Sequence, residues 1–249
     1  MRILKFLLIL ILISTPAYAV SGTTCYDLTE LVSLLHFNGT NGSTTFTDEK
    51  TITWTAVGNA ALTTTSPKFG SASLGVDGTG DYITAADNAR WDIGTSNYTV
   101  EFWINFAADT SIYAFSHGAG PNFGIQYNTT GNVWENYHNG ASVVTSGVWS
   151  PVVGTWYHIA LTRSGSSVRF FIDGTQSGST GTSAADITGG ATVFSIGAFN
   201  DGSNTLNGKI DEFSLIDGFA RWTGNFTAPT AEYTECVTTN AAKFMGFFE

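Results

Sequence analysis

The sequence predicts an all-β fold built from two packed antiparallel sheets, a β-sandwich or jelly roll. Short apolar runs recur about every 8–12 residues and are separated by polar, glycine-rich turns, as is typical of such folds. The 249 residues include 28 Gly and only 5 Pro, and 43% of them are hydrophobic. The chain can therefore bury a sizeable core within one domain. No sustained helical periodicity occurs beyond the N-terminal region.

The first residues are predicted to be a secretory signal peptide spanning 1–19. Arg2 and Lys5 precede an apolar stretch at 6–13, and a small-residue pattern ends at Ala19. The alternative is an uncleaved membrane anchor, but the apolar stretch is short for a bilayer span. We therefore expect a secreted protein, extracellular or periplasmic, with no stable membrane span after cleavage.

The chain is acidic, with a formal net charge of -10. Loss of the two basic residues of the signal peptide would leave 8 Lys+Arg against 20 Asp+Glu, a net charge of -12. The chain therefore lacks the excess of Lys and Arg that is typical of a nucleic-acid-binding protein. Its acidic charge suits a soluble secreted protein whose partners are neutral or cationic, divalent ions among them.

The first half of the chain is predicted to contain short strands. A helical turn should precede a strand near 33–37, because the apolar residues before it also have helical spacing. Two further strands are expected at 72–76 and 81–84, on either side of the turn DGTG. In the next strand, YTVEFWINF, apolar residues alternate with Glu101, Trp103 and Asn105. The alternating apolar residues are Val100, Phe102, Ile104 and Phe106.

The second half continues with hairpins. Alternation in WYHIALTRSGSSVRFFIDG predicts two paired strands joined by the turn SGSS. Asp173-Gly174 is a strong turn signal that leads into another short strand. The segments ATVFSIGAFND and GKIDEFSLIDG are predicted to be the last strands of the domain.

Two adjacent acids interrupt the apolar run GKIDEFSLIDG. Regular strand alternation would point Asp211 to the same face as Phe213 and Leu215, and Glu212 to the opposite face with Ile210. A carboxylate on a buried face must be hydrogen-bonded, paired or bound to a metal. Adjacent acids on opposite faces cannot act as one catalytic pair.

The two cysteines, Cys25 and Cys236, lie close to the ends of the predicted mature chain. In an exported protein such a pair suggests a disulfide, and the alternative is two buried thiols. The disulfide would close a loop of about 210 residues and contribute about 4–5 kcal/mol by restricting the unfolded chain. It would also require the first and last segments of the domain to be neighbours.

Several segments together resemble one family. In order they are LLHFNGTNGSTTFTDE, KFGSASLGVDGTGDYITAADN, YTVEFWINF, WYHIALTRSGSSVRFFIDG and GKIDEFSL. The chain resembles a laminin-G-like jelly roll of the concanavalin A-like lectin/glucanase superfamily over residues 31–232. The resemblance implies a two-sheet antiparallel jelly-roll sandwich with adjacent first and last strands. We expect this domain at 20–236, followed by an apolar C-terminal tail at 237–249.

The resemblance leaves function open, because this superfamily includes glycosidases, lyases, lectins and adhesive modules. Its hydrolases that use one strand carry Glu-x-Asp-x-x-Glu, and no Glu here begins that pattern. The sequence also lacks Gly-x-Ser-x-Gly and His-Glu-x-x-His. We therefore predict that the protein is not an enzyme. The alternative is a glycan-active enzyme whose active site is assembled from residues on separate strands.

Calcium is the predicted cofactor. If the terminal strands are neighbours, Asp211 could meet Asn38 or Asp48, and hard oxygen ligands of this kind suit calcium. The resemblance implies a structural calcium near this edge, although relatives commonly have Asp where Asn38 stands. The alternative is that Asp211 accepts backbone hydrogen bonds or pairs with Arg221.

Carbohydrate binding is predicted for the segment NVWENYHNG. Aromatic faces pack on sugar C–H groups while polar neighbours bond the hydroxyl groups. The predicted ligand-binding residues are Trp134, Asn136, Tyr137 and His138. The alternative is that these residues pack within the sandwich, because aromatic residues commonly fill such cores.

The sequence therefore predicts a secreted, non-catalytic carbohydrate-binding or adhesive module whose partner is a glycan or a cell-surface polysaccharide. The main alternative is a structural subunit of an extracellular filament or other assembly. Phe244, Met245, Phe247 and Phe248 give the C-terminal tail an unusual apolar character, which would permit self-association.

Overall fold

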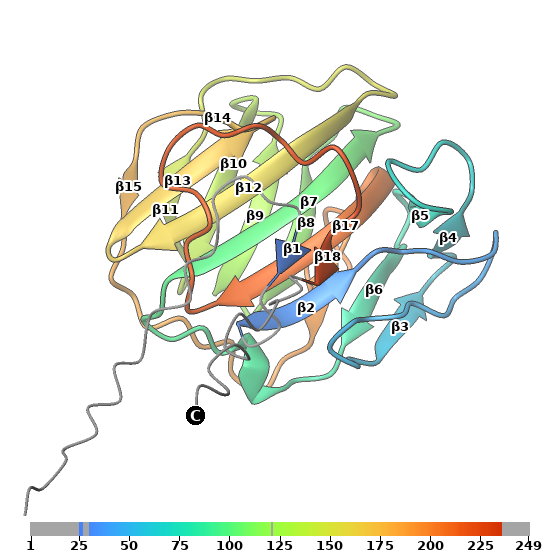
Figure 1. Cartoon of the computed structure of the whole chain (residues 1–249), viewed down its shortest axis with the longest axis horizontal. Helices are drawn as coiled ribbons and strands as arrows, with labels where there is room; N and C mark the ends of the chain where they lie inside the picture. Colours follow the sequence, from blue (N-terminus) through green and yellow to red (C-terminus); the bar gives the residue numbers. More distant parts are fainter. Residues whose placement is uncertain (1–24, 27–29, 121, 236–249) are drawn as a thin grey trace, which may run out of the picture.

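The computed structural model describes residues 25–26, 30–120 and 122–235 (Figure 1). The predicted signal peptide, Cys236 and the C-terminal tail at 237–249 lie outside the described residues. In the part of the chain that the structure describes, no helix is both long enough and apolar enough to cross a membrane.

Two antiparallel sheets form the fold, which confirms the predicted two-sheet sandwich. The nine-stranded sheet has the order β14-β13-β12-β7-β17-β5-β4, with β15 pairing to β13 and β2 to β17. These strands are β2 (Leu31–Leu35), β4 (Ala61–Thr63), β5 (Ser73–Asp77), β7 (Tyr98–Phe106), β12 (Trp156–Ser164), β13 (Ser167–Ile172), β14 (Thr175–Gln176), β15 (Gly181–Thr182) and β17 (Asn207–Asp217).

The seven-stranded sheet has the order β11-β10-β9-β8-β16-β6-β3. Its strands are β3 (Trp54–Val57), β6 (Tyr82–Ala85), β8 (Ile112–His117), β9 (Phe123–Asn128), β10 (Val133–His138), β11 (Ala141–Thr145) and β16 (Phe194–Ile196). A single 3-10 turn, Ala89–Trp91, is the helical element among the described residues, so the predicted β content is confirmed.

The core lies between the two sheets and is rich in aromatic residues. The alternation predicted for β7 is confirmed, because Val100, Phe102, Ile104 and Phe106 all belong to the core cluster. Phe102 packs against Trp134 of the other sheet and against Phe213 of β17. Glu101, Trp103 and Asn105 therefore belong to the opposite side of β7, which we call the outer face of the nine-stranded sheet.

The predicted hairpin is present, and β12 pairs with β13 from Ile159–Ile172 to Ser164–Ser167. A second tight turn follows at Asp173-Gly174, where both residues have positive φ and Ile172 pairs with Thr175. Two central residues of positive φ are typical of a type I′ hairpin turn, as the Asp-Gly pair predicted.

The structure corrects the predicted orientation of the two adjacent acids. Ile210 and Phe213 both lie in the core cluster, although regular alternation would put them on opposite faces. A bulge shifts the pairing of β17 with β7 between Asp211 and Ser214, and Glu212 has a φ of 50°. The inserted residue puts Asp211 opposite Trp103, away from the core that contains Phe213 and Leu215.

The first and last described segments are neighbours, as expected. The short strand β1 (Cys25–Tyr26) pairs in parallel with β18 (Thr234–Glu235). Leu31 and Val32, which the sequence assigned to a helical turn, belong to β2. The segment from 218 to 233 crosses the outer face of the nine-stranded sheet before it reaches β18 (Figure 1, orange to red).

Candidate functional site

A buried polar cluster lies between the outer face of the nine-stranded sheet and the segment 218–233. Arg221 Nη1 lies 3.0 Å from Glu101 Oε1, and His158 Nε2 lies 3.2 Å from Glu101 Oε2. The Tyr233 hydroxyl also donates to Glu101. Burial opposes ionisation of Glu101, but Arg221 and these hydrogen bonds hold its pKa below the usual value. The cluster fastens the C-terminal segment to the sheet, and its groups are closed to a ligand.

The three predicted calcium ligands each have protein partners of their own. Asp211 Oδ2 accepts hydrogen bonds from the backbone N–H groups of Lys68 and Phe69 at 2.9 and 3.2 Å. Asp48 Oδ2 accepts from the Ser33 hydroxyl and from the Trp54 indole at 2.6 and 3.0 Å. No hydrogen bond joins these two acids in the described part of the chain. Burial raises the pKa of Asp211 to about 8.

Asn38, the third predicted ligand, has different neighbours. Its carbonyl oxygen accepts a hydrogen bond from the Ser71 backbone at 2.6 Å, and its amide donates to Glu232. Among the described residues, Arg221 pairs with Glu101 and not with Asp211, so only the backbone hydrogen bonds of the predicted alternative are present.

Beside Asn38 lies a cluster of possible metal ligands that the sequence did not reveal. His36, Glu212 and Glu232 each provide one ligand atom, and these atoms all lie within 4.8 Å of one another. His36 Nδ1 is 2.8 Å from Glu212 Oε1, while Glu212 Oε2 accepts the backbone N–H of Tyr233. We call these three side chains the rim cluster. The bulge in β17 brings Glu212 to it, and regular alternation gave no sign of that bulge.

Burial and neighbouring charges set the pKa values of His36 and Glu212 in the rim cluster. Burial disfavours protonation of His36, but its hydrogen bond to Glu212 and the surrounding carboxylates outweigh burial and raise its pKa. Burial also raises the pKa of Glu212, which is fully closed to solvent, against the opposing effect of His36.

The four predicted glycan-binding residues divide between two faces of β10. Trp134 and Asn136 are 0% exposed and His138 is 2% exposed, because all three face into the sandwich. Trp134 stacks on Phe170 of the opposite sheet. Tyr137 is half-buried on the outward side of the strand. Of the predicted set, the structure leaves Tyr137 within reach of a glycan.

Tyr137 belongs to a small aromatic platform on the outside of the seven-stranded sheet. Its ring lies 6.4 Å from that of Tyr113, which in turn lies 5.0 Å from Phe199. The Tyr137 hydroxyl donates to Glu135 Oε2 at 3.1 Å and lies 3.3 Å from Gln126 Oε1. This platform has an amphipathic surface, because its aromatic rings lie beside polar groups.

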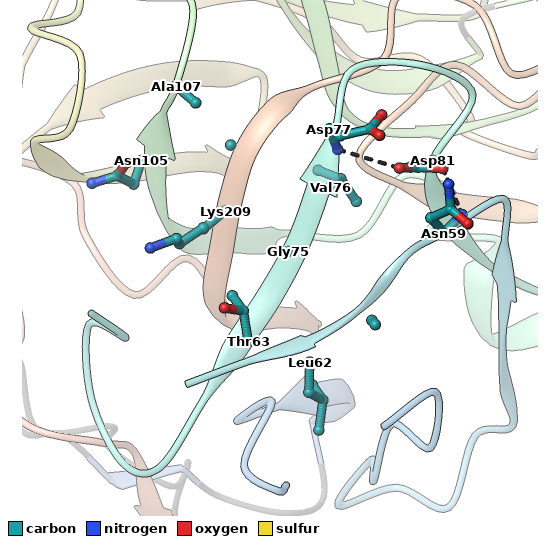
Figure 2. A pocket seen from close by; sticks show the side chains of 12 residues that line it. Asn59, Leu62, Thr63, Gly75, Val76, Asp77, Asp81, Asn105, Ala107 and Lys209 are labelled. Atoms are coloured by element: carbon teal, nitrogen blue, oxygen red, sulfur yellow. Dashed lines mark hydrogen bonds between the residues drawn. The ribbon is translucent and has the colours of Figure 1, made fainter. Parts of the chain in front are cut away.

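A groove of about 360 Å³ lies on the other sheet, at the edge formed by β4, β5, β7 and β17 (Figure 2). Small residues, Ala61, Gly75 and Gly208, form part of its lining. Small residues leave the backbone open to a ligand, because no side chain covers the sheet there. The full lining is Asn59, Ala61, Leu62, Thr63, Gly75, Val76, Asp77, Asp81, Asn105, Ala107, Gly208 and Lys209.

Polar groups lie at both ends of this groove. Figure 2 shows Asn105 and Lys209 on one side and Asp77 with Asp81 on the other. Asp81 is engaged, since its two oxygens accept the backbone N–H groups of Asn59 and Asp77. In contrast, the amide of Asn105 makes no hydrogen bond to any described residue, although the residue as a whole is only 8% exposed.

An aromatic residue, Trp156, lies next to Asn105 on the outer face of the nine-stranded sheet. Asn105 is paired with Lys209 on one side and with Trp156 on the other, so the three side chains share the outer face. Trp156 is half-buried, and its indole N–H donates to the Ser66 carbonyl at 3.2 Å. Finding this site from the sequence would have required the order in which β5, β7, β12 and β17 pair, and none of these strands directly follows another in the chain.

The comparisons with known proteins agree with the fold. A sequence profile named Laminin_G_3, described as Concanavalin A-like lectin/glucanases superfamily, matches residues 77–221, more than half of the chain. No curated protein sequence matches the chain.

Solved structures with a similar fold include domain 4 of AbnA, a GH43 extracellular arabinanase from Geobacillus stearothermophilus, in complex with arabinotriose. It is 20% identical, with a TM-score of 0.55, over 77% of this chain and 94% of that domain. The binding domain of Paraclostridial Mosquitocidal Protein 1 is 14% identical, with a TM-score of 0.59, over 78% of this chain and 50% of that one.

Trypanosoma rangeli sialidase is also similar, at 17% identity and a TM-score of 0.54, over 82% of this chain. The chain spans about a third of the sialidase, since the match covers 34% of that protein. At these identities the structures show a shared fold, and the sequence match identifies the family. The chain belongs to the concanavalin A-like lectin/glucanases superfamily.

Proposed function

We propose that the protein is a secreted, non-catalytic carbohydrate-binding module and that the groove beside Asn105 is its glycan site. The observation that carries the proposal is Asn105, which lines the groove and whose side-chain amide has no hydrogen-bond partner among the described residues. A sugar hydroxyl would satisfy that amide, which is otherwise costly to desolvate. Lys209 and Trp156 flank it with a charged donor and an aromatic face.

The chemistry of the groove suits a neutral sugar. Glycan sites need polar groups for the hydroxyls and an apolar surface for the C–H faces of the ring, and the groove combines Asn105, Lys209 and Asp77 with Ala61 and Leu62. Its volume of about 360 Å³ falls at the small end of ligand sites. This size favours a short oligosaccharide segment over a large globular partner.

The similar structures support the same function class. The arabinanase domain was solved with arabinotriose and belongs to an extracellular enzyme, and the mosquitocidal protein's domain is a binding domain. The export and the glycan binding proposed for this chain would match that pattern.

A non-catalytic role agrees with the acids near the groove. Glycoside hydrolysis needs two carboxylates that face the scissile bond, one able to donate a proton. Asp81 is 1% exposed, and both of its oxygens are occupied by backbone N–H groups. Only Asp77 presents an exposed carboxylate to the groove.

The proposal is tested by titration of the purified protein with arabinotriose and by a glycan array, comparing wild type with Asn105→Ala and Trp156→Ala. Tyr137→Ala is the matched control, because it removes an aromatic residue from the opposite sheet. We expect Asn105→Ala in the groove and Trp156→Ala beside it to weaken binding at least about tenfold while Tyr137→Ala binds normally. Loss of binding in Tyr137→Ala alone would move the site to the aromatic platform.

The predicted calcium ion is tested by the same array. Binding that disappears after treatment with a chelator and returns with calcium would support a calcium-dependent lectin. The ligand set Asp211, Asn38 and Asp48 stays a prediction, and Asp48→Asn is the variant that addresses it. Absence of binding to every glycan on the array would overturn the carbohydrate-binding function.

A structural subunit of an extracellular assembly is the second candidate, and exposed apolar residues favour it. Val148, Val152 and Val153 are 82%, 64% and 54% exposed on the loop before β12. Such a surface is suited to another protein surface. A chain truncated after Thr239 tests whether the apolar tail drives assembly, because size-exclusion chromatography would then show monomers only for the truncated form. Monomers in both forms would exclude this function for the tail.

A further inference from the structure

The rim cluster combines three chain segments at one point. His36 follows β2, Glu212 lies in the bulge of β17, and Glu232 precedes β18. Their ligand atoms already lie within 4.8 Å of one another, compared with about 3.4 Å for ligands of a tetrahedral Zn²⁺ ion at about 2.1 Å. No large rearrangement of the backbone is therefore needed to bring them to a common centre.

Among the described residues, no Lys or Arg side chain balances the carboxylates of the rim cluster. Glu212 and Glu232 face one imidazole, and a third carboxylate, Glu49, lies 3.9 Å from His36 Nε2. In the described part of the chain, no Lys or Arg forms an ion pair with Glu212 or Glu232. A divalent cation with a neutral imidazole and two carboxylates would give a neutral site, which lowers the cost of burying Glu212.

The oxygens of both carboxylates are already oriented by groups that are not ligands. The Tyr233 backbone N–H fixes one oxygen of Glu212 at 3.0 Å, and the Asn38 amide donates to Glu232. Such outer contacts hold metal ligands in place and raise affinity. The other oxygen of Glu212 lies 2.8 Å from His36 Nδ1, so an ion bound there would replace the hydrogen bond between His36 and Glu212.

The donor set indicates the class of ion. Calcium prefers six to eight oxygen ligands, and the imidazole of His36 does not suit it. One imidazole and two carboxylates, with water as a fourth ligand, are a suitable set for Zn²⁺ and related ions.

We propose that His36, Glu212 and Glu232 bind a first-row divalent metal ion of the Zn²⁺ class. The ion ties the end of β2 and the C-terminal segment to β17. It therefore stabilises the fold where the two ends of the domain meet, and it acts independently of the glycan groove.

The test uses untagged protein freed of metal by a chelator and titrated calorimetrically with ZnCl₂ and, separately, with CaCl₂. We expect one equivalent of zinc to bind and to raise the melting temperature. Replacement of zinc by Co²⁺ should give visible absorption bands of a low-symmetry site. His36→Gln and Glu232→Gln should each weaken zinc binding at least about tenfold.

Glu49→Gln is the matched control, because it removes a nearby carboxylate that is not a member of the rim cluster. It should bind zinc like the wild type. Circular dichroism of the metal-free variants confirms that each is folded. No saturable zinc binding to the wild type, zinc binding unchanged in both ligand variants, or stoichiometric binding of calcium but not zinc would each overturn the proposal.

Discussion

The guanidinium of Arg221 lies 3.0 Å from the carboxylate of Glu101, and both side chains are almost completely closed to solvent. Glu101 belongs to the middle of β7 and Arg221 to the segment that crosses the outer face of the sheet. This buried pair joins the C-terminal segment to the sandwich. A buried charge that loses its partner is costly, so the pair should be sensitive to single substitutions.

Arg221→Leu should lower the free energy of unfolding by about 3–5 kcal/mol, because it leaves the Glu101 charge without its guanidinium. Adding Glu101→Gln should recover part of that loss, since the double variant no longer buries an unpaired charge. Urea denaturation of the wild type, of each single variant and of the double variant measures both effects. Arg90→Leu, at an exposed arginine, is the control and should change stability by less than about 1 kcal/mol. A double variant that loses the sum of the two single effects would contradict coupling.

Asp211→Ala should destabilise the fold more than Glu212→Ala. The Asp211 carboxylate accepts three backbone hydrogen bonds, from Lys68, Phe69 and Glu212 itself. Each donor left unsatisfied costs about 1–3 kcal/mol if it stays buried. Glu212 accepts from one backbone N–H and from His36, whose ring can turn to solvent. Melting temperatures compare the two variants, with Asp211→Asn as the conservative control, and equal values for the alanine variants would refute the ranking.

Asp211 and Glu212 show what strand alternation could not predict from the sequence. Strand alternation correctly predicted the faces of β7 and of the hairpin β12–β13, because the pairing among these three strands has no register shift. In β17 the assumption of regularity was wrong, since one inserted residue changes the face of every residue on one side of it. A positive φ at Glu212 is not a local preference of glutamate, so the residue type gave no warning.

The binding residues were predictable in part. Applied to VWENYH, alternation would have separated Tyr137 from Trp134, Asn136 and His138, and the burial of β10 follows that pattern. The groove was not predictable in this way. It combines Gly75, Asn105 and Lys209 from three strands that are distant in sequence, and only the strand order places them together.

Gly174→Ala should destabilise the protein more than Gly165→Ala. Both glycines have positive φ, 78° and 58°, so alanine costs about 1–2 kcal/mol of backbone strain at either position. At Gly174 an added Cβ would also lie 2.1 Å from the Phe226 carbonyl oxygen, which the crossing segment places over the turn. At Gly165 nothing lies within 4 Å. Urea denaturation should therefore show a larger loss for Gly174→Ala, and equal losses would mean that the segment near Phe226 moves freely.

His138 should make the protein less stable in acid. Burial, with the charge of Arg163, lowers its pKa from 6.5 to about 3 in the folded state. Between these two values the unfolded chain binds a proton that the folded chain does not, so the free energy of unfolding falls as the pH falls. The slope contributed by one such group reaches about 1.4 kcal/mol per pH unit.

His138→Gln removes this titration and keeps a polar side chain beside Tyr98 and Ser183, which bond the imidazole at 2.8 and 2.7 Å. The variant should be less stable than the wild type at about pH 7, but its stability should fall less steeply towards about pH 4. Urea denaturation across this range measures the two slopes, and other titrating groups contribute equally to both proteins. Because only the difference in slope reports on His138, parallel curves would show that the imidazole becomes protonated in the folded state as readily as in the unfolded chain.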